Sequence, residues 1–311
     1  MRLLIMGLGS IGSMLAGYFA ENYDVYAVGR EWHVKPIIER GYLILRILFK
    51  SETRNVKLAK VSTSLKEFTG TRFDAMFVCV KAYDLENALA EIVSNNIDAD
   101  CYVFLQNGLG IEELAAKIIR NRNIIRALTN NGANIPEPGV VNHAGLGKTY
   151  ISGVFGEKKI EWGKRITELF NSVGLPAEYV RDITPYVFRK VAINAVINSL
   201  TAILRIKNRG VADLPELRGI VRGVCREIKE IAKKKGLNLG KLEEIVLSVA
   251  KETGENISSM LQDILRNKRT EIDFINGAIV KLGKELGVPT PVNETLYRLV
   301  KAIEKSREYR V

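Results

Sequence analysis

The sequence predicts an α/β domain followed by an all-helical domain. Up to about residue 130, short apolar runs alternate with stretches of helical periodicity, which is the pattern of a parallel sheet with crossover helices. Residues 134–181 then change to short strands and turns around one helix, and beyond Asp182 only helical patterns remain. A length of 311 residues suits two sizeable cores. We therefore expect one domain over residues 1–181 and a second over residues 182–311.

The first element is a short apolar strand that ends in a glycine-rich turn. Residues 1–12 read MRLLIMGLGSIG, and helical periodicity begins at Ser13. A G-x-G-x-x-G pattern between a strand and a helix is typical of a Rossmann-like dinucleotide-binding domain. The first glycine allows a tight turn, the second lets the backbone approach a pyrophosphate, and the third lets helix and strand pack closely. The residues expected along the phosphates are Gly7, Leu8, Gly9, Ser10, Ile11 and Gly12.

The second strand covers residues 23–28 and is followed by Gly29 and Arg30. A domain that binds NAD usually carries an acidic residue here, roughly 20 residues beyond the glycines, to bond the ribose 2′-hydroxyl. This chain has Arg30 instead, and a guanidinium can grip a 2′-phosphate with two hydrogen bonds. We therefore expect NADP(H) as the cofactor, with NADH as a weaker or alternative donor. A solvated arginine at a strand end is the alternative interpretation.

Polar residues follow the later strands of this domain. Residues 41–61 form a β-rich excursion, a buried strand covers 73–80, and further strands cover 101–105 and 124–128. Lys81 and Asn107 come directly after the first two of these, where the ligands of doubly wound sheets bind. Asn107-Gly108 is equally compatible with a plain turn. We expect Asp84 to cap the helix that follows Lys81.

Composition excludes several classes of protein. The net charge is +11, but Lys and Arg are spread among Glu residues on amphipathic helices with no aromatic-basic motif, so nucleic acid is not expected as a partner. The sequence contains no uncharged apolar stretch of ~18 residues, so no membrane span is expected. Three scattered cysteines and two histidines provide neither a disulfide framework nor a metal site. We expect a cytoplasmic protein with no bound metal, and Cys79 as a core residue.

The opening helix of the second domain contains an unusual polar stripe. Thr184-Pro185 is a helix-start signal, and the apolar helix that follows carries Lys190, Asn194 and Asn198 at spacings of four. Such spacing places the three side chains on one helix face. Buried polar groups must be paired or must meet a ligand. The stripe is therefore either a polar seam bonded to neighbouring helices or a binding face. Helices are expected at about 185–205, 213–235, 241–253, 259–268, 271–286 and 292–308.

Taken together, these stretches resemble the ketopantoate reductase (2-dehydropantoate 2-reductase) family, within the 6-phosphogluconate-dehydrogenase-like group. The segments that carry the resemblance run in family order: residues 7–12, 80–83, 106–110, 190–202, 258–263 and 270–276. The polar helix together with Ser258-Ser-Met-Leu-Gln-Asp263 is the most specific pair. Segments 41–61 and 130–140 look less typical of the family.

The resemblance implies roles for individual residues. Lys190 resembles the family's proton donor. The expected substrate contacts are Asn107, Lys190, Asn194, Asn198, Asn208 and Ser259. The expected cofactor contacts beside the glycine loop are Arg30, Lys81, Asn107, Ala133 and Glu271. The implied reaction is NADPH-dependent reduction of 2-dehydropantoate to (R)-pantoate, in the pathway to pantothenate and coenzyme A.

The chemistry of that reaction suits these residue types. Reducing a 2-oxo acid develops negative charge on the carbonyl oxygen, and a partly buried lysine can supply the proton. Two amides one turn apart can hold a polar substrate. Ser259 with Gln262 also matches a capping box, and Glu271 could be a solvated first-turn residue. The remaining alternatives are a related reductase of another 2-oxo or 3-hydroxy acid and a non-catalytic NADP-binding sensor. We further expect a homodimer, and feedback by coenzyme A at the cofactor cleft is a minor hypothesis.

Overall fold

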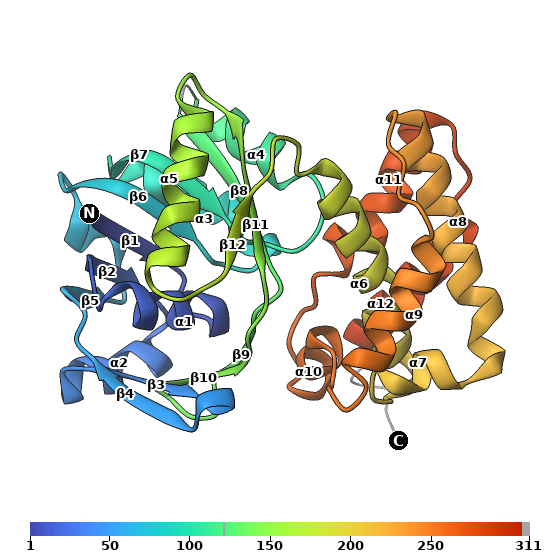
Figure 1. Cartoon of the computed structure of the whole chain (residues 1–311), viewed down its shortest axis with the longest axis horizontal. Helices are drawn as coiled ribbons and strands as arrows, with labels where there is room; N and C mark the ends of the chain where they lie inside the picture. Colours follow the sequence, from blue (N-terminus) through green and yellow to red (C-terminus); the bar gives the residue numbers. More distant parts are fainter. Residues whose placement is uncertain (121, 307–311) are drawn as a thin grey trace. The chain divides into compact units, whose positions relative to one another are not determined.

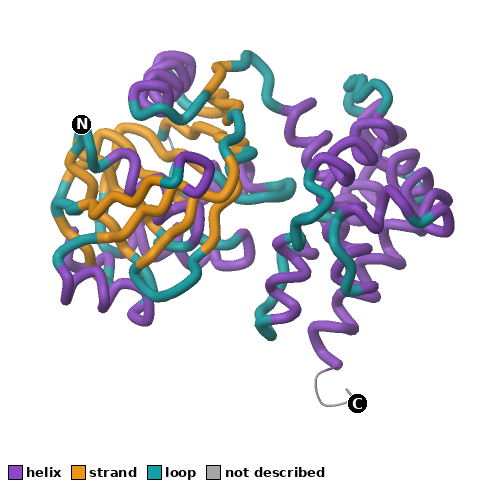
Figure 2. The backbone as a smooth tube through the Cα atoms, turned by 60° about the horizontal axis from the view of Figure 1, so that its bottom comes forward, coloured by secondary structure: helices purple, strands orange, loops and turns teal. Residues whose placement is uncertain are grey.

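The computed structural model describes residues 1–120 and 122–306. The chain forms two compact units (Figure 1). The first comprises Met1–Gln106 and Ile111–Ile183, and the second comprises Asn107–Gly110 and the chain from Thr184 onwards. Figure 2 shows the contrast between them, because the strands gather in the first unit and the second is built of helices and loops. The predicted α/β and all-helical succession is therefore confirmed.

The first unit is built on an eight-stranded sheet with the order β12-β11-β8-β7-β6-β1-β2-β5. All neighbouring strands are parallel except β8 and β11, which are antiparallel. The strands of this sheet are β1 (Arg2–Met6), β2 (Asp24–Val28), β5 (Lys60–Ser62), β6 (Arg72–Val78), β7 (Asp98–Phe104), β8 (Asn123–Thr129), β11 (Thr149–Phe155) and β12 (Ala177–Tyr179).

Helices and short turns connect these strands. The helices of the first unit are α1 (Ser10–Phe19), α2 (Glu31–Arg40), α3 (Leu85–Ser94), α4 (Ile111–Ile118) and α5 (Lys159–Ser172), with 3-10 turns η1 (Leu48–Lys50), η2 (Leu65–Phe68) and η3 (Ala82–Asp84). From β1 the chain first builds outwards through β2 to β5, and then returns to β6 on the other side of β1. The carboxyl ends of β1 and β6 therefore flank the topological switch point, where sheets of this kind bind ligands.

A second sheet of four strands lies in the same unit, with the order β4-β3-β10-β9. Its strands are β3 (Leu43–Ile47), β4 (Glu52–Val56), β9 (Gly132–Asn134) and β10 (Val140–Gly145). The β-rich excursion expected over residues 41–61 is present, but its pairing with the later segment was not predicted. The central pair, β3 with β10, joins Ile44 to Val140 across nearly a hundred residues.

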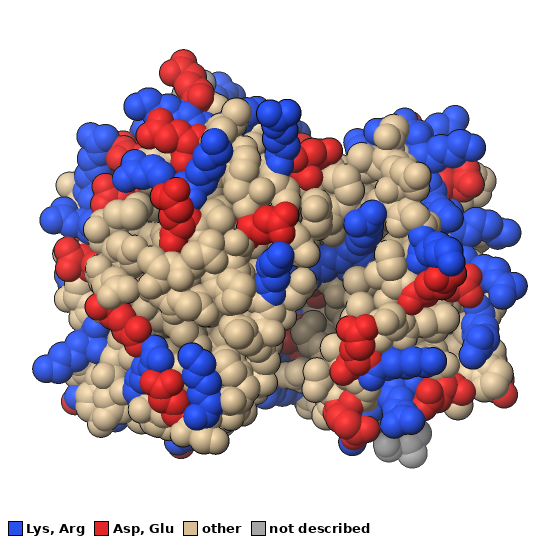
Figure 3. Space-filling model, in the orientation of Figure 1, with Lys and Arg blue, Asp and Glu red and all other residues tan. Residues whose placement is uncertain are grey.

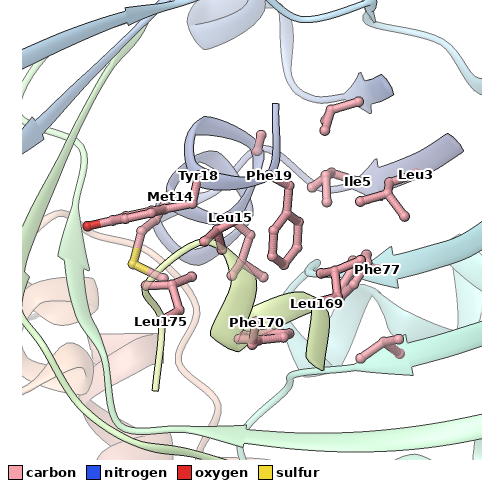
Figure 4. Packing of buried hydrophobic residues seen from close by; sticks show 14 of the residues in the cluster. Leu3, Ile5, Met14, Leu15, Tyr18, Phe19, Phe77, Leu169, Phe170 and Leu175 are labelled. Carbon is pink, nitrogen blue, oxygen red and sulfur yellow. The ribbon is translucent and has the colours of Figure 1, made fainter. Parts of the chain in front are cut away.

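Aromatic packing joins α1 and α5 to the large sheet (Figure 4). The ring centroids of Phe19 on α1 and Phe77 on β6 lie 5.0 Å apart, and Phe170 on α5 lies 5.3 Å from Phe19. All three residues are buried, so each contributes both apolar burial and favourable ring geometry. This packing holds α1, whose first residues follow the glycine turn, against the sheet.

The second unit consists of helices packed around α6 (Thr184–Leu204), which contacts α7, α8, α9, α10 and α12. The others are α7 (Arg209–Asp213), η4 (Pro215–Leu217), α8 (Arg218–Lys234), α9 (Leu242–Glu252), α10 (Ser259–Leu265), η5 (Ile272–Phe274), α11 (Asn276–Leu286) and α12 (Pro291–Lys305). Two expected helices are subdivided: residues 213–235 break at Pro215, and residues 271–286 begin as a 3-10 turn. The last two residues of the expected helix 292–308 lie outside the described residues.

Helix α6 is also the one helix in the described ranges that is long and apolar enough to cross a membrane. Its mean hydropathy is 1.4 over the most apolar window, and Arg189 and Lys190 are its charged residues. The same length and composition are found in core helices, and 67% of that window is buried inside the structure. Its apolar surface is thus largely accounted for by packing.

Candidate functional site

The glycine turn after β1 has the geometry that a dinucleotide phosphate needs. Gly7 has φ of +101°, and a Cβ added there would lie 2.8 Å from Val80 N, just beyond β6. A Cβ on Gly12 would lie 2.0 Å from Gly7 O. These two positions therefore require glycine, for backbone conformation and for helix–strand packing respectively.

Gly9 differs from the other two glycines because the space around it is open. No described atom lies within 4 Å of a Cβ added there, and Gly9 is exposed. It is the N-cap of α1, and no side chain caps that helix end in the described structure. The first N–H groups of α1 and the bare backbone of Gly9 thus form an anion-binding end. This cradle fits the pyrophosphate of a dinucleotide.

Arg30 follows β2 and pairs with Asp84 in η3. Arg30 Nη2 donates to Asp84 Oδ2 at 3.0 Å, and the Arg30 side chain remains 67% exposed. Asp84 occupies the N-cap position of α3, as expected, but its carboxylate makes no capping hydrogen bond to that helix. The Asp84 carboxylate accepts a hydrogen bond from the Arg30 guanidinium instead. Arg30 is therefore held beside the carboxyl ends of β2 and β6 with further N–H groups available to a ligand.

The other residues expected at the cofactor lie in the same unit. Lys81 is half-buried at the N-cap of η3, in the short connection that follows β6. Ala133 lies in β9, where it pairs with His143 and packs against the hydrophobic core. Cys79 also packs against that core, and burial raises the pKa of its thiol. The expectation that Cys79 is a core residue therefore agrees with its packing.

The polar stripe of α6 provides the most informative geometry. Asn194 is half-buried and Asn198 is 8% exposed, yet neither side chain has a hydrogen bond to any residue that the structure describes. Lys190 is half-buried on the same helix. The seam interpretation requires the two amides to be bonded to neighbouring helices, and the described contacts contradict this. Two amides in this state are suited to bind a polar ligand.

A polar seam does exist on α6, but it uses a different face. Ser199 Oγ donates to Asn276 Oδ1 at 2.8 Å, and Asn276 Nδ2 donates to Ala195 O at 3.2 Å. Asn276 is fully buried, and it lies inside the stretch 270–276 that carried the family resemblance. Its type and position did not distinguish it from an ordinary helix-start asparagine, so sequence reasoning missed it.

Asn208 has a buried carbonyl without a partner. The residue is 7% exposed, and its Nδ2 donates to Thr253 Oγ1 at 2.9 Å. Its Oδ1 is buried and accepts no hydrogen bond within the described residues. An acceptor left in this state carries a desolvation cost, which a donor on a ligand would relieve.

The structure changes the interpretation of the two serines before α10. Ser258, not Ser259, is the N-cap: its Oγ accepts from Leu261 N at 3.2 Å and pairs with Thr201 Oγ1 at 2.7 Å. Gln262 Nε2 donates to Ile257 O rather than closing a box with Ser259. The capping-box alternative for Ser259 is therefore wrong. Ser259 is exposed at the first residue of α10.

Asn107 and Glu271 lie together within the second unit. Asn107 Nδ2 donates to Glu271 Oε2 at 3.3 Å, and Leu109 N donates to Phe274 O at 3.1 Å. Glu271 is 7% exposed, so it is not the solvated first-turn glutamate of the alternative interpretation. Gly108 has φ of +105°, and a Cβ there would lie 2.3 Å from Phe274 O. The loop after β7 is thus fitted against η5.

The buried His33 has a structural role. Gly139 N donates to His33 Nδ1 at 2.9 Å, so Nε2 carries the proton and donates to Ser13 Oγ at 3.0 Å. Burial, reinforced by the charge of Arg40, lowers the pKa of His33 to about 4. Within the described residues, no group of three or more His, Cys, Asp or Glu side chains could hold a metal ion.

Comparison with known proteins agrees with this arrangement. The model of the family "Ketopantoate reductase PanE/ApbA" matches residues 3–154, and that of its C-terminal domain matches residues 182–304. A 2-dehydropantoate 2-reductase of Archaeoglobus fulgidus is 38% identical over 97% of this chain and 98% of its own length.

Solved structures show the same likeness along the whole chain. A PanE/ApbA family ketopantoate reductase from Ralstonia eutropha JMP134 has a TM-score of 0.89 and 27% identity, covering 99% of this chain and all of that one. A D-mandelate dehydrogenase with NADH and anilino(oxo)acetate has a TM-score of 0.87 and 25% identity, covering 98% of this chain and 99% of that one.

The fold and the glycine turn thus define a two-unit oxidoreductase that uses a nicotinamide dinucleotide. More narrowly, the chain belongs to the ketopantoate reductase family. The resemblance inferred from the sequence motifs is therefore confirmed.

Proposed function

We propose that this chain is an NADPH-dependent 2-dehydropantoate 2-reductase that forms (R)-pantoate for pantothenate and coenzyme A synthesis. One observation carries the proposal furthest: in a chain of this family, Asn194 and Asn198 keep two amides without hydrogen-bond partners in the described structure, on the face of α6 that carries Lys190. Unpaired amides of this kind are costly in a core helix and useful in a binding face.

The proposed division of labour follows the two units. Residues 1–181 act as the NADP-binding domain, and residues 182–311 act as the substrate-binding and catalytic domain. The cofactor contacts proposed in the first are the glycine loop from Gly7 to Gly12, Arg30, Lys81 and Ala133. Asn107 and Glu271, which are bonded to each other, are proposed as further cofactor contacts, and Asn107 is shared with the substrate.

The reaction requires a hydride donor, an acid and a held substrate. A bound dinucleotide would supply the hydride that reduces the 2-oxo carbon. Lys190 Nζ donates a proton to the carbonyl oxygen as negative charge develops there. Asn194 and Asn198 orient the substrate through their amides, because each amide can both donate and accept. Asn208 offers its carbonyl oxygen as an acceptor, and Ser259 offers its hydroxyl, to the remaining polar groups of the substrate.

We also propose that the chain prefers NADPH to NADH. It rests on Arg30, whose guanidinium can bond a 2′-phosphate, and on the absence of an acidic residue at that position of the sequence. NADH remains an alternative donor, because the D-mandelate dehydrogenase of similar structure carries NADH. Measuring the dissociation constants of NADPH and NADH shows which of the two binds more tightly.

A second candidate substrate follows from that same neighbour. Its 2-oxo acid analogue, anilino(oxo)acetate, favours the alternative that this chain reduces a related 2-oxo acid. Turnover of 2-dehydropantoate against a panel of 2-oxo acids, each with NADPH, separates the two. A preference of less than about tenfold for 2-dehydropantoate would favour the alternative. Tight NADPH binding without turnover of any acid would instead indicate a sensor.

Location, assembly and regulation complete the proposal. We place the protein in the cytoplasm as a homodimer that binds its small-molecule substrate without a membrane or nucleic-acid partner. The Lys and Arg side chains in Figure 3 lie among Asp and Glu rather than in one basic field on that face. Coenzyme A shares a phosphorylated adenosine with NADPH, so feedback would take the form of competition. Sedimentation tests the dimer, and titration of coenzyme A against NADPH tests competition.

A further inference from the structure

A chain of buried hydrogen bonds crosses four helices of the second unit. It begins at Ser199 on α6, passes through Asn276 on α11 and Asn293 on α12, and ends at Glu227 on α8. Asn276 Nδ2 donates to Asn293 Oδ1 at 3.1 Å, and Asn293 Nδ2 donates to Glu227 Oε2 at 2.7 Å. Ser199, Asn276 and Asn293 are fully buried, and Glu227 is 4% exposed. Every link is satisfied, which is the condition for such a network to rigidify a core.

Asn276 holds α6 at two points. Its Nδ2 donates to Ala195 O and its Oδ1 accepts from Ser199 Oγ, and these two residues are one helical turn apart. Asn194 and Asn198 each precede one of them by a single residue. One residue turns a helix by ~100°, so the anchored side and the side with the two free amides are separated by about that angle. Two anchors one turn apart fix the rotation of α6, and with it the direction of both amides.

The same residue is connected to the other part of the site within this unit. Asn276 lies five positions after Glu271, as the first residue of α11 just beyond η5. Glu271 bonds Asn107, and Phe274 in that segment bonds Leu109. Asn276 therefore sets α6 relative to the segment that holds Asn107 and Glu271.

We infer that Asn276 is a positioning residue, which directs Asn194 and Asn198 toward the substrate through its two bonds to α6. The inference rests on the proposed function, because those two amides are its proposed substrate contacts. Asn276 does not itself touch the substrate. A misplacement of about 1 Å at a binding residue can cost roughly 100-fold in rate, so a small rotation of α6 is enough to be measured.

Asn293 provides a matched control for a purely structural role. It belongs to the same chain of hydrogen bonds and is equally buried, but it makes no hydrogen bond to α6 among the described residues. Its N–H and its side-chain amide both donate to Glu227, which also accepts from Val292 N at 2.8 Å. Its replacement therefore destabilises the start of α12 while leaving both bonds from Asn276 to α6 in place.

The experiment compares Asn276→Ala and Ser199→Ala with the control Asn293→Ala. For each variant, kcat and KM for 2-dehydropantoate, the NADPH dissociation constant and the melting temperature are measured. We expect Asn276→Ala to raise KM by about 10- to 100-fold and Ser199→Ala by about 3- to 10-fold, with NADPH binding unchanged. Asn293→Ala should lower the melting temperature as much as Asn276→Ala while keeping KM within about twofold. Ser199→Ala removes a single oxygen, so it carries the test if Asn276→Ala does not fold.

Equal KM increases in the Asn276 and Asn293 variants would overturn the inference, and so would an unchanged KM in Ser199→Ala. Amide hydrogen exchange supplies a readout that does not depend on turnover. Amide exchange along α6 should rise more in Asn276→Ala than in Asn293→Ala. If Asn276→Ala does not fold, Ser199→Ala takes its place in this comparison. Equal exchange rates in the anchor variant and the control would contradict the anchoring. Absence of turnover by the native chain would count against the proposed function alone, because the exchange comparison still tests the anchor.

Discussion

The side-chain amide of Asn107 donates a 3.3 Å hydrogen bond to Glu271, a residue 164 positions further along the chain. The loop that carries Asn107 leaves β7 of the first unit, yet Asn107–Gly110 belongs to the second compact unit. Two proposed cofactor contacts from distant parts of the sequence are therefore fixed relative to each other by packing within one unit.

Gly108 makes that packing possible, so Gly108→Ala should disrupt it. A Cβ there would lie 2.3 Å from Phe274 O, with φ of +105° adding backbone strain. We expect a loss of at least about 2 kcal/mol in unfolding free energy and weaker dinucleotide binding. Gly110→Ala is the control, because φ there is +81° but no described atom lies within 4 Å of the added Cβ. Denaturant titration of both variants measures the difference; equal losses would show that strain alone, and not the contact with Phe274, matters.

Arg30 and Asp84 give opposite predictions for cofactor preference. Arg30→Ala should weaken NADPH binding by about tenfold or more and leave NADH binding nearly unchanged, because only the 2′-phosphate needs the guanidinium. Asp84→Asn removes a negative charge 3.0 Å from that guanidinium, so NADPH should bind more tightly by a few-fold. Both effects should shrink at high salt, since the pair is exposed. Fluorescence titration with the two dinucleotides checks this, and weaker NADPH binding by Asp84→Asn would mean that Asp84 assists the arginine.

His33 should make stability depend on pH in a defined range. Its pKa is lowered from 6.5 to about 4 in the folded protein, so the unfolded chain binds more protons between these values. The contribution is complete above about pH 6.5 and is lost as the pH falls toward 4, amounting to on the order of 3 kcal/mol. Replacing His33 by Gln should lower stability at neutral pH and flatten this part of the profile. An unchanged slope between pH 6.5 and 4 in His33→Gln would contradict the assignment.

Regular elements and local motifs were predictable because their signals are local. The strand, glycine turn and helix at the N-terminus and the stripe of α6 depend on spacing within one element. The sequence pattern placed the cap of α10 at Ser259, whereas the structure has it at Ser258. A helix start that shifts by one residue changes which hydroxyl meets the free N–H groups. The pairing of β3 with β10 was not predictable, since nothing local specifies a partner a hundred residues away.

The hydrogen-bond partners of the candidate side chains also could not be predicted from the sequence. The spacing of Asn194 and Asn198 was equally consistent with a polar seam, and only the packed structure shows that Ser199 and Asn276 form the seam instead. Likewise, Asp84 was a reasonable helix cap by position, and its ion pair with Arg30 depends on β2 and β6 lying on either side of β1 in the sheet.

Lys190 carries the central claim, and the loss of NADPH absorbance with 2-dehydropantoate tests it most directly. The native chain should oxidise NADPH only when the keto acid is present. Lys190→Ala should lower kcat by about 10²- to 10⁴-fold with NADPH binding retained, while the exposed-lysine control Lys281→Ala should keep native kcat. Near-native kcat in Lys190→Ala, or no turnover by the native chain, would contradict the account.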